Sequence, residues 1–150
     1  MKSPAKDPAA ARDMATAVEL RVLVGKLRRR LRQQANFGGL PWSQVSVLGH
    51  LERDGPATVT TLARAEGMRP QSMGANVSAL LEAGLVRGDP DPDDGRQTVL
   101  SLTPACHKLI KASRAAREDW LFHAIQTRLA PKEQAQLAST VELLKRLVES

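Results

Sequence analysis

The residues best suited to chemistry in this 150-residue chain lie in one short amphipathic segment and in the loop that follows it. Four side chains of the segment can contact the edges of base pairs: Gln71, Ser72, Ala75 and Asn76. Glutamine and asparagine can each form two hydrogen bonds to adenine, serine can bond a base or a phosphate, and alanine can touch the thymine methyl group. These residues predict base reading in the major groove of DNA, and the alternative is a solvated polar face such as any amphipathic helix has.

A single cation, Arg96, lies between Asp89 and Thr103, directly after the acidic run DPDPDDG. A lone guanidinium on a narrow projecting loop fits the minor groove of DNA. Asp94 is placed to orient this guanidinium by a charge-assisted hydrogen bond. Arg69 adds a cation just before the amphipathic segment. We therefore expect Arg69, Asp94 and Arg96 to belong to the same DNA-binding surface.

The amphipathic segment predicts a helix over residues 70–83, and Pro70 suits its first position. Its apolar residues recur at spacings of three and four and are expected to face a core: Met73, Val77, Leu80 and Leu81. This orientation turns the base-reading residues outward. A shorter helix is predicted over residues 58–66, with Thr58 as its N-cap, and a break near Gly67 makes the pair a helix-turn-helix.

A β-hairpin is predicted after this helix. Gly84 ends the helix, Leu85 and Val86 begin one strand, and residues 98–102 alternate as the returning strand. A helix-turn-helix followed at once by a hairpin is typical of a winged helix. The predicted fold class is therefore mainly α with a small β wing as the only sheet.

With these elements the chain resembles the MarR family of bacterial transcriptional regulators, and the resemblance covers nearly the whole chain. It rests on three segments: LRRRLRQQ, LPWSQVSVLGHLERDGPATVTTLA and RPQSMGANVSALLEAGLVRGDPDPDDGRQTVLSLT. The resemblance implies a homodimer whose lobes read a pseudo-palindromic operator, often as a repressor that a small molecule releases. By the same resemblance, Arg96 is the wing arginine and Asp94 its partner. The chain departs from the family at Gly88, where an arginine is usual, and has Arg87 one position earlier.

The flanking segments are predicted to be dimerisation helices. Helices are expected over residues 11–35, 104–127 and 131–148, and a further helix over residues 42–53. Two apolar stripes need partners: Leu20, Leu23, Val24, Leu27 and Leu31, and Leu137, Val141, Leu144 and Val148. Packing of these stripes within one chain is the alternative to a dimer.

The predicted organisation has three parts. Residues 1–10 form a flexible N-terminal arm, residues 11–35 and 104–150 form the dimerisation helices, and residues 36–103 form the winged helix-turn-helix lobe.

Sensing of a small aromatic or anionic effector is implied by the family resemblance, which places a pocket where the first two helices meet. The candidate residues are Arg32, Phe37, Leu40, Trp42 and His50. An apolar joint with a nearby cation could hold an aromatic acid, and the alternative is that Phe37 and Trp42 simply pack the joint. Cys106 is interpreted as a small buried hydrophobe rather than a redox sensor.

The net charge of +6 favours a polyanionic partner, but the charge is unevenly distributed. Residues 1–35 hold nine lysines or arginines against three acids, whereas residues 36–88 balance at four against four. Residues 89–103 hold one arginine against four aspartates. The predicted DNA lobe is not itself basic, which makes individual base contacts more important than bulk charge.

The sequence disfavours several classes of protein. We find no phosphate loop, nucleophile elbow or paired metal-ligand motif, so neither an enzyme nor a cofactor or metal site is expected. No run is long and apolar enough for a membrane span, and the first residues lack a signal-peptide core, so a cytoplasmic location is expected. The alternative function is a winged-helix dimer that serves as a protein-interaction module without specific DNA readout. The neutral lobe and Gly88 motivate this alternative.

Overall fold

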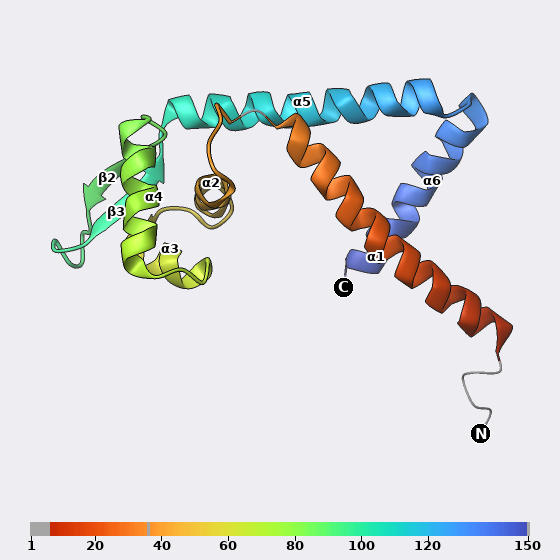
Figure 1. Ribbon diagram of the computed structural model, residues 1–150, viewed down its shortest axis with the longest axis horizontal. Coiled ribbons are helices and arrows are strands. Elements are labelled where there is room, and N and C mark those ends of the chain that lie inside the picture. The colour runs from red at the N-terminus through yellow and green to blue at the C-terminus, as the bar shows by residue number, and fades with distance from the viewer. Residues whose placement is uncertain (1–6, 36, 150) are drawn as a thin grey trace. The chain divides into compact units, whose positions relative to one another are not determined.

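A computed structural model describes residues 7–35 and 37–149 (Figure 1). The helices are α1 (Pro8–Gln34), α2 (Trp42–Asp54), α3 (Val59–Ala65), α4 (Pro70–Glu82), α5 (Pro104–Arg128) and α6 (Pro131–Val148). The strands are β1 (Ala57–Thr58), β2 (Val86–Pro90) and β3 (Thr98–Leu102). The predicted fold class, mainly helical with a small sheet, is confirmed.

The described residues divide into two compact units. The first, which we call the lobe, comprises residues 37–114, and the second, the helical unit, comprises residues 7–35 and 115–149. The lobe therefore continues to Arg114 and does not end at residue 103 as predicted. The physical reason is that Cys106 and Ile110, in the first turns of α5, are buried in the lobe core.

The lobe core is built from one buried face of each of its helices. Val47, Leu48 and Leu51 come from α2, and Leu62 and Ala63 come from α3. The remaining buried apolar side chains come from α4, the sheet and its approaches, and α5: Met73, Val77, Leu80, Ala57, Leu85, Val86, Leu100, Cys106 and Ile110. This core fixes how α4 is turned about its own axis.

The sheet has three strands in the order β1-β3-β2, all antiparallel. The predicted hairpin pairs Val86 with Leu102 at its base and Pro90 with Thr98 near its tip. The prediction missed β1, whose Ala57 pairs with Leu100. Two residues are too short for an alternating pattern to be seen. Thr58 also begins α3, as predicted, because its side chain accepts a hydrogen bond from the Thr61 backbone N–H at 3.2 Å.

The two ends of α4 are set by residues that the sequence singled out. Pro70 occupies the first turn, and Gly84 follows the C-cap with a φ of 73°. The Leu85 backbone N–H donates to the Leu80 carbonyl at 3.0 Å, which closes the helix. Thr103 then joins this end to α5, because its hydroxyl donates to the Gly84 carbonyl at 2.7 Å and accepts from the Cys106 N–H at 3.2 Å.

One predicted core position of α4 is wrong. Leu81 is 43% exposed, whereas Leu80 is fully buried. Adjacent residues on a helix are separated by about 100° around its axis. When Leu80 points into the core, Leu81 therefore lies at the edge of the buried face.

In the helical unit, α1 begins at Pro8, earlier than predicted. The Asp7 side chain caps α1 by accepting a hydrogen bond from the Ala9 N–H at 3.0 Å, so residues 8–10 are helical and do not belong to a flexible arm. The rest of the predicted arm, residues 1–6, lies outside the described residues. At the other end, Pro131 begins α6, and the Glu133 carboxylate accepts from the Ala130 N–H at 2.9 Å. None of the described helices is long and apolar enough to cross a membrane.

We predict that the substitutions Leu80→Ala and Leu81→Ala will separate core from surface on α4. Leu80→Ala should lower the free energy of unfolding by about 2–5 kcal/mol, because it leaves a cavity in the lobe core. Leu81→Ala, the matched control on the same helix, should lower it by less than about 1 kcal/mol. Urea denaturation at a fixed protein concentration measures both, and equal losses would contradict this orientation of α4.

Candidate DNA-binding surface

The start of α4 presents its polar side chains to solvent. Gln71, Ser72 and Ala75 are exposed, as predicted, on the side away from the buried Met73, Val77 and Leu80. Arg69 is also exposed and is the N-cap residue, but its side chain makes no capping hydrogen bond. The backbone N–H groups at the start of a helix carry partial positive charge, so this end suits a phosphate.

Asn76 is less accessible than the other three predicted base-reading residues. It is half-buried, and its Nδ2 donates to the Met68 Sδ at 3.8 Å. One donor of the amide is therefore directed back toward the turn that precedes α4. The available groups of Asn76 are its remaining donor and its carbonyl oxygen.

The turn between α3 and α4 is fixed by two contacts that no sequence pattern indicated. The Ser46 hydroxyl of α2 donates to the Glu66 carboxylate at 2.6 Å, across twenty positions of sequence. The Met68 N–H donates to the Ala63 carbonyl at 2.9 Å, and Gly67 between them adopts a φ of 63°. The first contact holds the turn of the helix-turn-helix against α2, and the second closes the turn on α3.

The tip of the hairpin that joins β2 to β3 is closed by local hydrogen bonds. The Asp91 N–H donates to the Gln97 carbonyl at 2.9 Å, and the Gln97 N–H donates to the Asp94 carbonyl at 3.0 Å. Arg96 is exposed on this tip, and Figure 1 shows the loop extending beyond the strands that flank α4. The lobe thus carries two separate elements that can contact a polyanion, the start of α4 and the wing tip.

The predicted bond between Asp94 and the Arg96 guanidinium is not among the interactions of the described residues. Asp94 Oδ1 instead accepts a hydrogen bond from the Arg96 backbone N–H at 3.1 Å. The reason is geometric. A short aspartate side chain reaches the backbone N–H two residues ahead more readily than it reaches the guanidinium at the end of a long arginine side chain.

Gly88 has a steric reason to lack a side chain. A Cβ added there would lie 2.7 Å from the Thr98 Cγ2, closer than real contacts allow. The neighbouring Arg87 is exposed and forms an ion pair with Asp89 at 3.4 Å. This hairpin therefore offers Arg96 at its tip and an ion-paired Arg87 nearer its base.

The predicted effector residues come from both units. Phe37 and Leu40 are partly buried and pack against the lobe core, whereas Trp42 is 52% exposed. His50 is half-buried, with its Nδ1 3.4 Å from the Asp54 carboxylate. Arg32 belongs to the helical unit rather than to the lobe.

Cys106 is fully buried at the start of α5. Burial raises the pKa of its thiol to about 11, and the nearby negative charge of Glu52 adds to this rise. Since the thiolate is the reactive form, the thiol stays protonated and unreactive near neutral pH. This supports the interpretation of Cys106 as a packing residue.

Comparisons with known proteins agree with this architecture. A profile described as MarR family matches residues 38–97. An uncharacterized HTH-type transcriptional regulator of Mycobacterium bovis is 35% identical over 137 residues, which cover 91% of this chain and 95% of that protein.

Solved structures show the same similarity. A Pseudomonas aeruginosa protein is 36% identical, with 93% of this chain and 97% of that chain covered and a TM-score of 0.74. A mutant of MepR from S. aureus, bound to an oligodeoxyribonucleotide, is 20% identical, with 88% and 97% covered and a TM-score of 0.66. The similarity therefore extends over both units.

Proposed function

We propose that this chain, which belongs to the MarR family of transcriptional regulators, acts as a homodimer that binds a pseudo-palindromic operator in duplex DNA. The exposed face at the start of α4 carries this proposal, because side chains able to read base pairs lie there on a helix that the core holds in place. The MepR mutant of similar fold is bound to an oligodeoxyribonucleotide, which supports DNA as the ligand.

In this proposal α4 enters the major groove. Gln71 and Asn76 hydrogen-bond base edges, Ser72 bonds a base or a phosphate, and Ala75 contacts a thymine methyl group. Arg69 neutralises a backbone phosphate beside the start of the helix. The burial of the opposite face of α4 supports this assignment, because it places Gln71, Ser72 and Ala75 on the side of the helix away from the core.

The wing tip is proposed to enter the adjacent minor groove through Arg96. Among the described residues, the Arg96 guanidinium has no hydrogen bond or ion pair, and its side chain is exposed. The described part of the lobe carries no net positive charge. A guanidinium placed in a narrow minor groove therefore contributes more to DNA binding than the overall electrostatic attraction of the lobe would.

Dimerisation is proposed to occur through the helical unit. None of the described residues of α1 or α6 is buried. Large apolar side chains are instead exposed along the unit: Met14, Val18, Val22, Leu23, Val24, Leu27, Phe122, Val141, Leu143, Leu147 and Val148. Exposed apolar surface on this scale favours a partner, and a second copy would bury it and place two lobes on one two-fold axis.

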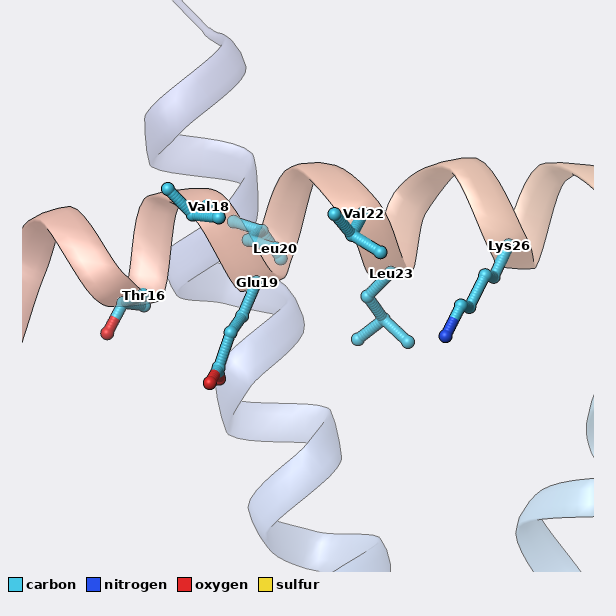
Figure 2. A pocket seen from close by; sticks show the side chains of 7 residues that line it. All are labelled: Thr16, Val18, Glu19, Leu20, Val22, Leu23 and Lys26. Carbon is cyan, nitrogen blue, oxygen red and sulfur yellow. The ribbon is translucent and has the colours of Figure 1, made fainter.

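Part of that surface is an open groove of about 520 Å³ along α1. Figure 2 shows the side chains that line it: the apolar Val18, Leu20, Val22 and Leu23 and the charged Glu19 lie between Thr16 at one end and Lys26 at the other. Four of the seven lining side chains are apolar, which suits a packed interface that also carries some polar groups.

Repression and release by an effector complete the proposal. An operator that overlaps a promoter would let the bound dimer block transcription. The exposed ring of Trp42 and the half-buried imidazole of His50 are the lobe groups proposed to contact a small aromatic or anionic effector, with Phe37 and Leu40 supplying apolar wall. Arg32, in the other unit, is not required by this proposal.

The substitution Arg96→Ala tests the wing assignment. We expect it to weaken operator binding by about 1–3 kcal/mol, the range of one good base contact, without changing dimerisation. Arg87→Ala is the matched control, because it removes the same charge from an exposed position of the same hairpin that already has Asp89 as a partner. It should weaken binding by less than about 1 kcal/mol.

Fluorescence anisotropy with labelled operator DNA measures both variants. Equal losses would show that bulk charge, rather than a placed guanidinium, explains the contribution of Arg96. If the wild-type chain retains no duplex from a random-sequence library at physiological salt, the result favours the protein-interaction alternative.

The substitution Leu23→Asp tests the proposed dimer. Leu23 is 60% exposed and lines the groove on α1, so a carboxylate there should raise the dimer dissociation constant at least about tenfold. Arg21→Asp is the control, because it introduces the same group about 200° away around the helix. Analytical ultracentrifugation measures the dissociation constant, and a monomeric wild type or equal effects of both variants would refute this interface.

A further inference from the structure

Met68 lies two residues before α4 and is held in place from two sides. Its backbone N–H donates to the Ala63 carbonyl at 2.9 Å, and its partly buried side chain packs against the lobe core. The turn that contains it is also tied to α2 by the hydrogen bond from Ser46 to Glu66. The sulfur of Met68 is therefore a group with a defined position beside the start of α4.

Asn76 brings its side-chain amide to this sulfur. Its Nδ2 donates to the Met68 Sδ at a distance of 3.8 Å. A thioether sulfur has no proton to donate and can only accept, so the side facing Met68 favours the NH₂ group of the amide over its carbonyl oxygen. The two ends of the amide are thus distinguished by a neighbour within the protein, before any DNA is bound.

The orientation of an asparagine amide matters for base reading. To recognise adenine, the amide oxygen accepts from the N6 amino group and the amide nitrogen donates to N7. This pairing uses the oxygen and one of the two N–H groups, so the second N–H of Asn76 is available for the Met68 sulfur. The contact with Met68 is therefore compatible with adenine recognition, and it fixes the order in which the acceptor and the donor are presented to the groove.

We infer that Met68 is a specificity-determining positioning residue, whose sulfur fixes the orientation of the Asn76 amide and thereby favours one base pair at the position that Asn76 reads. The inference rests on the proposed function, in which Asn76 contacts a base edge. An amide that is free to turn over can satisfy different bases by exchanging its donor and its acceptor, whereas a held amide loses hydrogen bonds at the wrong base pair. Met68 should therefore affect base discrimination more than overall affinity.

Two substitutions separate the sulfur of Met68 from its packing. Met68→Leu keeps a similar apolar volume and removes the acceptor. Met68→Gln keeps a side chain of similar length and offers a carbonyl oxygen as the acceptor in place of the sulfur. A third variant, Asn76→Ala, identifies the base pair that Asn76 reads, because discrimination should be lost at that position alone.

The experiment uses fluorescence anisotropy with a duplex that the wild-type chain selects from a random-sequence library, and with duplexes that each carry one base-pair change. Discrimination at a position is the ratio of the dissociation constants of the changed and the unchanged duplex. At the base pair identified by Asn76→Ala, Met68→Leu should lower this ratio about three-fold, the size expected for one weak hydrogen bond. Met68→Gln should keep the wild-type ratio. In the Asn76→Ala background, Met68→Leu should change nothing at that position.

The other base pairs of the operator are the internal control. Their ratios should be unchanged in Met68→Leu, since a residue that only supports the packing of α4 would alter every base contact of that helix. A loss of the same size at every base pair would overturn the inference. It would also be overturned by equal losses in Met68→Leu and Met68→Gln, by no loss in Met68→Leu, or by an Asn76→Ala variant that keeps every base preference.

A second measurement does not depend on DNA. The chain has two asparagines, so the side-chain NH₂ signal of Asn76 is assigned by its absence from the spectrum of Asn76→Ala. Its ¹⁵N order parameter in the free protein should fall in Met68→Leu, and an unchanged value would overturn the inference. Failure of the wild type to bind any duplex would refute the proposed function, while the order parameter would still decide whether Met68 holds the amide.

Discussion

The burial of one face of α4 in the lobe core is the interaction on which the rest of this structure depends. Met73, Val77 and Leu80 pack among side chains of α2, α3, the sheet and α5. Because a helix is rigid, this contact sets the direction of every other side chain on α4, including those proposed to read bases. The same core receives Leu100 of β3, so the wing and α4 are fixed to one framework.

The distribution of charge decides how this framework can recognise DNA. A regulator with a basic lobe can gain much of its affinity from counterion release, which is independent of sequence. This lobe lacks a net positive charge, and the wing tip carries aspartates around Arg96. In the proposed function, recognition therefore depends on a few placed groups, and small displacements of α4 or of the wing tip matter more than they would in a basic lobe.

The sequence predicted the elements well and their local contacts less well. Periodicity and Pro70 located α4, and the turn residues located the hairpin, because these signals arise within a few residues. Leu81 was wrongly assigned to the core, because apolar residues spaced by three and four positions do not define where the buried face of a helix ends. The Ser46–Glu66 bond and the crowding of Gly88 by Thr98 join residues that only the tertiary fold brings together, so no local pattern could indicate them. Asp94 was predicted to bond the Arg96 guanidinium, but its carboxylate accepts a hydrogen bond from the Arg96 backbone N–H instead.

Selection of binding sites from a library of random duplexes tests the central claim most directly, because the operator sequence is an outcome of the selection. The purified full chain is incubated with the library near physiological salt, and retained duplexes are sequenced over several rounds. The account predicts enrichment of one pseudo-palindromic motif with half-sites about one helical turn apart. Enrichment of no motif, or of a single half-site without symmetry, would contradict it.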